Sequence, residues 1–138
     1  MNRDIIFRAK CSGVWRYGSY VHFDKKPTNS RCNINYKDFI ITNEDDGENY
    51  YPITDLSSVG QYTGLKDKEG KRIFEGDIVI IGEKLKTKVV YYDGAFRMQS
   101  EFSPTPTDTT DMGYMMREFS VRIIGNIHDN PELLKGGK

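Results

Sequence analysis

Short stretches of strand-forming residues, separated by tight turns, constrain the fold of this sequence more than any other feature. Ser12-Gly13, Asp46-Gly47 and Asp93-Gly94 stand between such stretches. Asp-Gly readily supplies the positive φ that a tight β-hairpin needs. Nine Tyr and seven Phe strengthen the strand preference, because aromatic side chains favour strands over helices. The sequence therefore predicts a mainly β protein.

The first half is interpreted as a smaller β-rich module over residues 1–58. Residues 14–23 alternate between two faces, with the period of two that is typical of a half-buried strand. The strands expected in this module cover residues 5–7, 14–23, 39–42 and 49–51. Residues 55–58 are expected to connect it to the second half, residues 59–138.

The second half contains a sharp corner at Glu75-Gly76-Asp77, followed by an apolar run. Gly permits such a corner, and Asp can accept hydrogen bonds from the backbone there. Further strands are expected over residues 84–92, 95–98 and 121–125, and a helical turn over residues 131–134. Residues 112–119 fit either a short helix or a strand. Five or so short strands joined by tight turns are typical of a small barrel.

Two long blocks of the second half are similar to the signature of a known family. Residues 60–79 read GQYTGLKDKEGKRIFEGDIV, and residues 123–134 read IIGNIHDNPELL. In this order and spacing they resemble the YopX family of phage and prophage proteins, and residues 7–9 and 15–18 resemble the opening of that family. His128-Asp129 and Phe74 are mild departures from residues that are commoner in the family.

The resemblance implies an SH3-like barrel over residues 59–138, preceded by the β-rich module of residues 1–58. It also implies a gene carried by a phage, a prophage or another mobile element. It supplies no catalytic residue, because the family has no established activity. Polar side chains beside Gly turns often bond to the backbone, so we favour a structural role over a site for the signature residues. These are Gly60, Gln61, Tyr62, Gly64, Gly70, Glu75, Gly76, Asp77, Gly125 and Asn126.

Metal-binding and catalytic patterns are weak. The His and Cys residues of the chain are Cys11, His22, Cys32 and His128. None has another such residue two to four positions away, as ligands of structural zinc sites usually do. The sequence shows no phosphate loop, nucleophile elbow or Cys/His signature. We therefore expect a non-enzymatic protein with no metal or other cofactor.

The sequence shows no signal-peptide pattern, and no apolar run approaches the ~20 residues that a membrane-spanning helix needs. A soluble, cytoplasmic protein with no membrane partner is expected. Both thiols would stay reduced in that compartment, although the sequence alone leaves a disulfide between Cys11 and Cys32 open.

Charge gives no global attraction to nucleic acid, because 20 basic and 20 acidic residues balance. Residues 1–40, however, hold eight basic and three acidic side chains, a net charge of 8 − 3 = +5. Small barrels can bind strands through basic and aromatic side chains. The candidates for nucleic-acid binding are Arg8, Lys10, Arg16, Tyr17, Tyr20, Lys84, Lys86 and Lys88. Solvated strand faces, with Lys protecting an edge, are the alternative interpretation.

A role in protein–protein interaction is the leading hypothesis. Met and Tyr are favoured at interfaces, and six of them are candidates for an exposed patch, with core packing as the alternative for each. They are Tyr50, Tyr51, Met112, Tyr114, Met115 and Met116. The sequence thus predicts a module that binds an unknown protein partner or itself, and nucleic-acid binding is the second hypothesis.

Overall fold

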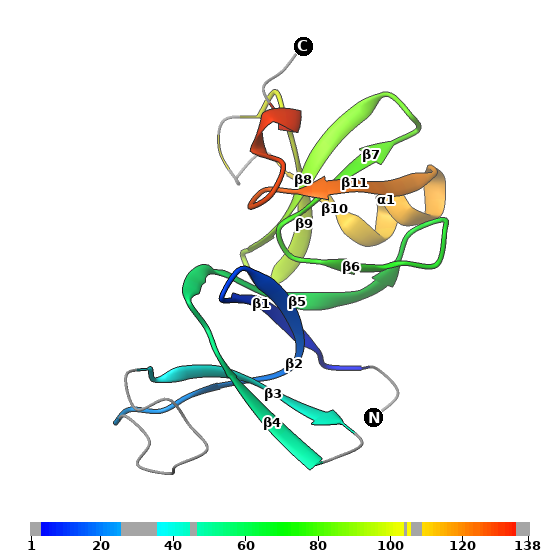
Figure 1. The fold of residues 1–138 in the computed structure, drawn as a ribbon. Helices are drawn as coiled ribbons and strands as arrows, with labels where there is room; N and C mark the ends of the chain where they lie inside the picture. The colour runs from blue at the N-terminus through cyan, green and yellow to red at the C-terminus, as the bar shows by residue number, and fades with distance from the viewer. Residues whose placement is uncertain (1–3, 26–35, 45–46, 104, 106–108, 135–138) are drawn as a thin grey trace. The chain divides into compact units, whose positions relative to one another are not determined.

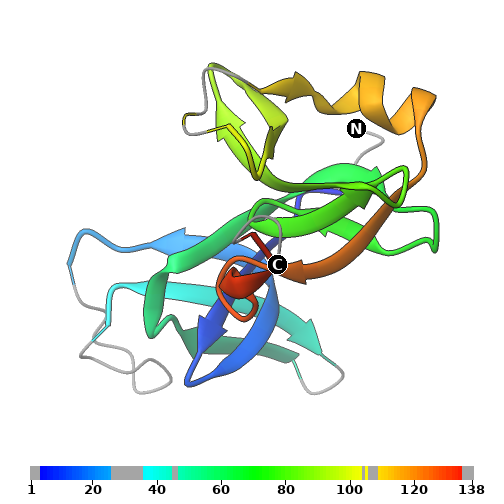
Figure 2. The same ribbon diagram turned by 90° about the horizontal axis from the view of Figure 1, so that it is seen from above.

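The computed structural model describes residues 4–25, 36–44, 47–103, 105 and 109–134. This described part holds eleven β-strands, one α-helix and one 3₁₀ helix (Figure 1; Figure 2). The chain divides into two compact units, Met1–Tyr62 and Thr63–Lys138. Strand β5, Asp55–Lys66, contributes residues to both. The protein is mainly β, as the sequence predicts.

The first unit is built from antiparallel strands in the order β4-β3-β2-β1-β5. Its strands, besides the first part of β5, are β1 Phe7–Cys11, β2 Val14–His22, β3 Asp38–Glu44 and β4 Gly47–Pro52. Ser12-Gly13 forms the turn between β1 and β2, as expected, with Cys11 opposite Val14.

One core cluster of the first unit is formed by side chains of β1, β3 and the residue that follows β4. Ala9, Cys11, Ile40 and Ile53 are buried there, and Phe7, Tyr20, Tyr51 and Val59 pack against them. Gly18 of β2 has a specific steric role, since a Cβ at this position would collide with the carbonyl oxygen of Ile41 on β3. Close approach of β2 and β3 therefore requires Gly at this position.

In the second unit, the end of β5 pairs with β6, and five further strands form an antiparallel sheet in the order β10-β9-β8-β7-β11. The strands are β6 Arg72–Phe74, β7 Asp77–Ile81, β8 Leu85–Tyr92, β9 Ala95–Ser100, β10 Thr110–Asp111 and β11 Val121–Asn126. Helix α1 covers Met112–Glu118, and the 3₁₀ helix η1 covers Pro131–Leu134. The buried core is Ile73, Val79, Ile81, Val89, Met98, Met112 and Val121.

The corner at residues 75–77 is fixed by backbone hydrogen bonds. Gly76 has a φ of 93°, which favours Gly. Its amide donates to the carbonyl of Val89 at 2.8 Å. The carboxylate of Asp77, only 2% exposed, accepts from the amide of Phe74 at 2.7 Å. These bonds fix the direction in which the chain enters β7, most of whose apolar side chains are buried.

Several sequence predictions are refined or corrected. The predicted helical turn is confirmed as η1, and residues 112–118 adopt the helical alternative. The connector expected at residues 55–58 is wrong, because these residues begin β5, where the buried Ser58 hydroxyl accepts from the amide of Lys10 at 2.7 Å. The strand expected at residues 5–7 instead begins at Phe7. Neither sheet closes on itself among the described residues, so the SH3-like barrel is not confirmed.

Candidate functional site

An apolar groove opens on the second unit between α1 and the β7–β8 hairpin. It has a volume of about 370 Å³. Its lining residues come from the end of β7, the hairpin turn, the start of β8 and the end of α1: Ile81, Gly82, Lys84, Leu85, Met115 and Phe119. Phe119 is 48% exposed, whereas Ile81 is buried. The groove therefore offers apolar surface to a ligand on a floor that belongs to the core.

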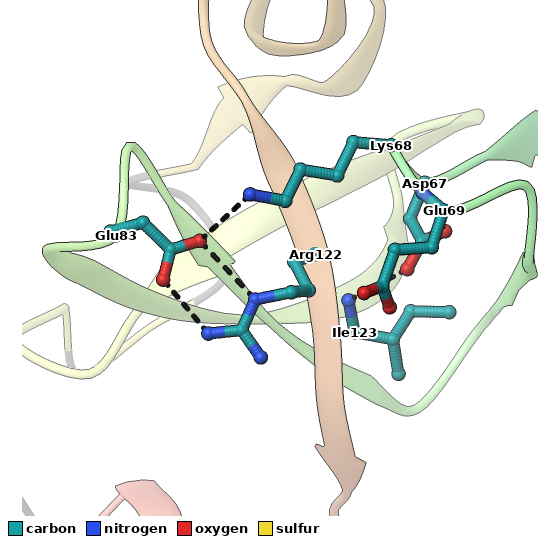
Figure 3. A network of polar contacts seen from close by, with 6 residues as sticks. All are labelled: Asp67, Lys68, Glu69, Glu83, Arg122 and Ile123. Atoms are coloured by element: carbon teal, nitrogen blue, oxygen red, sulfur yellow. Dashed lines mark hydrogen bonds and ion pairs between the residues drawn. The ribbon is translucent and has the colours of Figure 1, made fainter.

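The hairpin turn beside this groove is held by a charged network (Figure 3). Glu83 has a φ of 58°, an uncommon conformation for a residue other than Gly. Its carboxylate accepts two hydrogen bonds from the Arg122 guanidinium, at 2.8 and 3.2 Å, and one from Lys68 Nζ at 3.4 Å. The bonds from Arg122, together with the one from Lys68, lower the pKa of Glu83 to about 2. The network thus ties the turn to β11 and to the β5–β6 turn.

Asp67 orders the β5–β6 turn from which Lys68 reaches Glu83. Its buried carboxylate accepts from the backbone amides of Glu69 and Lys71, both at 2.9 Å, and of Ile123 at 3.1 Å. Figure 3 shows Asp67 with Glu69 and Ile123. Burial alone would raise the pKa of Asp67, but these hydrogen bonds outweigh it and lower the pKa overall. The charged carboxylate of Asp67 therefore holds three backbone amides in place.

The helical wall of the groove is fixed as well. Asp111 caps α1 by accepting from the amide of Tyr114 at 2.9 Å. At the other end, the amide of Phe119 donates to the carbonyl of Met115 at 3.0 Å. The amide of Gly82 then donates to the carbonyl of Ser120 at 2.8 Å, which joins the hairpin turn to the residues that follow α1. Both walls are consequently held in place by backbone contacts.

The residues predicted to form an exposed Met and Tyr patch divide between core and surface. Met112 is 2% exposed and belongs to the core, so the core-packing alternative holds for this residue. Met115 and Met116 are half-buried, and Tyr114 is 48% exposed. Tyr50 and Tyr51 lie in the first unit. Ile81 and Leu85, which complete the groove, were not predicted as site residues because their strand pattern reads as ordinary core.

The basic and aromatic residues predicted near the N-terminus lie on two opposite faces. Arg8 stands opposite Tyr17, and Lys10 opposite Trp15, so these side chains share a face of the β1–β2 hairpin. The guanidinium of Arg8 lies 4.6 Å from the Trp15 ring centroid, and the ammonium of Lys10 lies 5.5 Å from it. Cations and rings on this face are therefore stacked on one another.

The opposite face of the same hairpin carries Arg16 and Tyr20. Arg16 pairs with the buried Ala9, and its guanidinium lies 4.1 Å from the ring centroid of Tyr51. Tyr20 packs against the core of the first unit. The predicted nucleic-acid residues of this region are thus not one continuous surface.

The three predicted lysines belong to the second unit. Lys86 and Lys88 lie on β8 opposite Ile80 and Ile78, and both are half-buried. Lys84 is in the hairpin turn, where it is exposed and lines the groove. The structure therefore places one of these lysines at the candidate site and two on a strand.

Several signature residues lie in the first part of the matched blocks. Gly60 and Gln61 pair with Arg8 and Phe7 of β1. Tyr62 is 6% exposed, and its amide donates to the carbonyl of Ile6 at 2.8 Å. Gly64 follows within β5. Gly70 lies in the Asp67 turn and donates to the carbonyl of Asp67 at 3.0 Å.

The remaining signature residues form the corner of residues 75–77, with Glu75 half-buried, and the end of β11. A Cβ on Gly125 would lie 2.7 Å from Asn130 Oδ1 and 2.9 Å from Leu133 Cδ1. Asn126 Oδ1 accepts from the amides of His128 and Asp129, both at 2.9 Å. These contacts shape the loop between β11 and η1.

A second polar cluster joins β2 to β3 in the first unit. The Tyr20 hydroxyl donates to Asp38 Oδ1 at 2.7 Å, and His22 Nδ1 lies 2.8 Å from the same oxygen. Burial and the bond to Asp38 raise the pKa of Tyr20 to about 12. Burial alone would raise the pKa of Asp38, but the bonds to Tyr20 and His22 lower it overall. The cluster links neighbouring strands.

The described residues contain no group of three His, Cys, Asp or Glu side chains close enough to hold a metal ion. Cys32 lies outside the described residues. The thiol of Cys11 is buried, and burial raises its pKa more than nearby Arg16 lowers it. No helix in the described chain is long and apolar enough to cross a membrane.

These features define a small, mainly β protein of two units, with an open apolar groove in the second. The chain belongs to the YopX family, since the family profile, described as YopX protein, matches residues 7–135. No curated protein matches the chain. The crystal structure of protein EF1440 from Enterococcus faecalis is similar over 97% of this chain and 100% of that one, with 24% sequence identity and a TM-score of 0.51. At this identity, the similarity concerns the fold alone.

Proposed function

We propose that this protein is a non-enzymatic interaction module that docks a partner protein in the groove between α1 and the β7–β8 hairpin. The observation that carries the proposal is the open apolar lining of this groove, in which Phe119 is 48% exposed. Its volume of about 370 Å³ falls within the range of ligand-binding clefts. An accessory role in a phage or prophage is part of the proposal and rests on the family resemblance alone.

The held walls of the groove support this proposal. The Glu83–Arg122–Lys68 network and the bond between Gly82 and Ser120 fix the hairpin before any ligand arrives. A preformed groove loses less conformational entropy on binding than one that must assemble. Side chains from α1 and the hairpin can therefore contribute their apolar surface to affinity.

The charge at the rim favours a particular kind of peptide. Lys84 is exposed, and no carboxylate among the described residues pairs with its ammonium. Glu83, the adjacent acidic residue, is already bonded to Arg122 and Lys68. The partner is accordingly a peptide segment that inserts an apolar side chain and places an acidic residue beside Lys84.

A peptide-display selection on the intact chain tests this proposal. Selected peptides are synthesised with a fluorescent label, and their affinities are measured by fluorescence polarisation. We expect an apolar anchor next to an acidic residue. Phe119→Asp is expected to weaken binding roughly tenfold or more, because the charge must be desolvated at the anchor site. Lys84→Glu is expected to weaken it roughly threefold to tenfold.

Tyr91→Asp is the matched control, because Tyr91 is 56% exposed on β8 but does not line the groove. Thermal unfolding verifies that each variant stays folded. Peptides that bind Phe119→Asp as tightly as the unaltered chain, or that lose affinity equally in Tyr91→Asp, would refute the groove as the docking site.

Nucleic-acid binding is the second candidate function, and the face of the β1–β2 hairpin that carries Lys10, Trp15 and Tyr17 favours it. Arg8 lies on the same face but is only 6% exposed, so it is not offered as a phosphate contact. Tyr17 is 49% exposed beside the stacked cations. A titration with labelled single-stranded DNA at several salt concentrations tests this role, because phosphate contacts make affinity fall as salt rises. Equal affinities for the unaltered chain and Tyr17→Ala would remove this face from consideration.

A further inference from the structure

The turn that follows β9 exposes an aromatic side chain to solvent. Phe102 is 73% exposed, more than any other large apolar residue of the described chain. Its amide donates to Ser100 Oγ at 3.0 Å, and the amide of Ser103 donates to the carbonyl of Ser100 at 3.0 Å. The Gln99 side chain closes the turn by donating to the carbonyl of Ser103 at 2.9 Å. The turn therefore carries an exposed ring on a backbone that hydrogen bonds hold in place.

An acidic residue precedes this ring. The amide of Glu101 donates to the carbonyl of Lys86 on β8 at 3.1 Å, which joins the start of the turn to the sheet. The carboxylate of Glu101 forms no ion pair within the described part of the chain, although Lys88 lines the same small cleft. Glu101 and Phe102 thus combine an unpaired carboxylate with an apolar anchor, which are the two features that suit a groove with Lys84 at its rim.

Other exposed segments of the chain match the groove less well. Leu56 is 57% exposed and follows Asp55, but the Asp55 carboxylate already accepts from the amide and the hydroxyl of Ser57, at 3.2 and 2.6 Å. Tyr92 precedes Asp93 and is only 38% exposed. The turn after β9 therefore offers the most exposed anchor together with an unpaired carboxylate.

The groove is large enough to hold this ring. A cavity of about 150 Å³ accommodates a benzene ring, and the groove has a volume of about 370 Å³. Within one chain, the ring of Phe102 is in solvent and the groove is open. Contact between two chains would remove both apolar surfaces from water, which is favourable.

We propose that the groove between α1 and the β7–β8 hairpin receives the Glu101-Phe102 turn of a second copy of this chain. The ring of Phe102 packs against Leu85 and Phe119 of the other copy, and the Glu101 carboxylate pairs with its Lys84. The inference rests on the proposed function, since it names the partner that docks in the groove. A contact with a single anchor is small, so we expect weak association that depends on chain concentration.

Sedimentation equilibrium of the full chain at increasing concentration tests the proposal. We expect the average mass to rise above that of one copy. Phe102→Ser is expected to weaken association roughly tenfold or more, because the anchor is lost. Leu56→Ser is the matched control, since it removes an exposed apolar side chain outside both the turn and the groove. It is expected to leave association unchanged, and thermal unfolding verifies that each variant is folded.

Mixing two defective variants separates docking from damage to the fold. Phe102→Ser retains the groove and lacks the anchor, whereas Phe119→Asp retains the anchor and places a charge in the groove. Neither variant is expected to associate with itself. A mixture restores one contact, between the Phe102 turn of one variant and the groove of the other. We therefore expect a species of two copies in the mixture alone, and its absence would contradict the proposal.

Exchange of the two charges tests the polar part of the contact. Glu101→Lys and Lys84→Glu are each expected to weaken association roughly threefold to tenfold. The double variant restores the pair with its charges reversed, so we expect it to recover most of the loss. A double variant that associates no better than either single variant would overturn the pairing of Glu101 with Lys84.

Failure of self-docking and failure of the proposed function give different results. A chain that stays monomeric at every concentration, or an association that survives Phe102→Ser, would overturn the second copy as the occupant. The docking function itself is decided by the selected peptides. Peptides that bind the unaltered chain and lose affinity for Phe119→Asp would leave the groove as the docking site of a different protein.

Discussion

The two units differ in whether cationic side chains lie over their aromatic rings. In the first unit, cationic side chains cover rings, since Arg8 stacks on Trp15 and Arg16 on Tyr51. In the second, Phe119 is 48% exposed beside the groove, and Lys84 stands at the rim. Basic and aromatic residues that alternate in a sequence can therefore form cation–π contacts with one another, rather than with a ligand. The ring that lacks such a cover is the better candidate for a ligand.

Gly18→Ala is expected to have the largest effect on stability, because it destabilises the closely packed strands β2 and β3 of the first unit. The added Cβ collides with the backbone carbonyl of Ile41, which cannot move without disturbing β3. We expect the free energy of unfolding to fall by about 3 kcal/mol, the upper part of the range for overpacking. Urea unfolding followed by the fluorescence of Trp15, the single Trp of the chain, measures the loss.

Gly113→Ala is the matched control in the second unit. A Cβ there lies 3.3 Å from Arg117 Nη1, the end of a flexible side chain. Replacing Gly within a helix by Ala then favours the helix by up to about 1 kcal/mol. Equal destabilisation by both substitutions would contradict the contrast in packing.

Tyr20→Phe removes the hydroxyl that joins β2 to β3 through Asp38. A hydrogen bond to a charged group contributes about 2 kcal/mol, and partial exposure of Asp38 brings the expected loss closer to about 1.5 kcal/mol. Urea unfolding at neutral pH measures this loss. A Tyr20→Phe chain as stable as the unaltered one would show that the cluster does not hold the strands together.

The same cluster predicts how stability depends on pH. The pKa of Asp38 is lowered on folding, so its stabilisation is present above the unfolded pKa, near 4, and is lost as pH falls through the lower folded value. The pKa of Tyr20 is raised to about 12. Its stabilisation is present below the unfolded pKa, about 10, and is lost as pH rises toward 12. Tyr20→Phe should flatten the alkaline limb between these values, as unfolding at each pH would reveal.

The sequence predicted the parts of the fold that depend on local chemistry. Turns at Ser12-Gly13 and Asp93-Gly94, the corner at Gly76 and the helical turn of η1 all follow from residues close together in the chain. The expected connector at residues 55–58 was wrong, because its strand character comes from pairing with β1, a long-range contact. Local patterns do not contain that information.

The candidate site was predictable only in part. The Met and Tyr cluster pointed to α1, but the same residue types serve as core, and Met112 is buried. The groove appears only when Leu85 of β8 and Phe119 come together from distant positions in the chain. The charged partners of Glu83 are likewise remote, with Arg122 thirty-nine residues away. Long-range contacts therefore determine which residues form the groove and the charged network, and the periodicity of the sequence does not reveal these contacts.

Arg16→Met and Lys84→Met sharpen the contrast between a covered and an uncovered ring. Met retains much of the apolar stem and removes the charge. Arg16→Met is expected to lower the free energy of unfolding by about 1.5 kcal/mol, since a half-buried cation–π contact is lost. Lys84→Met, at the open rim, is expected to change it by less than about 0.5 kcal/mol. Urea unfolding compares the two, and equal losses would mean that the cation over Tyr51 is no more structural than the exposed lysine.

Thr87→Val is expected to have a modest effect, and its sign is informative. Val has the shape of Thr without the hydroxyl, so the buried Oγ1 that has no partner is removed. We expect the free energy of unfolding to rise by about 1 kcal/mol, because the cost of burying an unbonded hydroxyl disappears. A decrease would instead mean that a water molecule already bonds Thr87 in the free protein. The same urea measurement therefore tests whether the second unit buries the Thr87 hydroxyl without a hydrogen-bond partner.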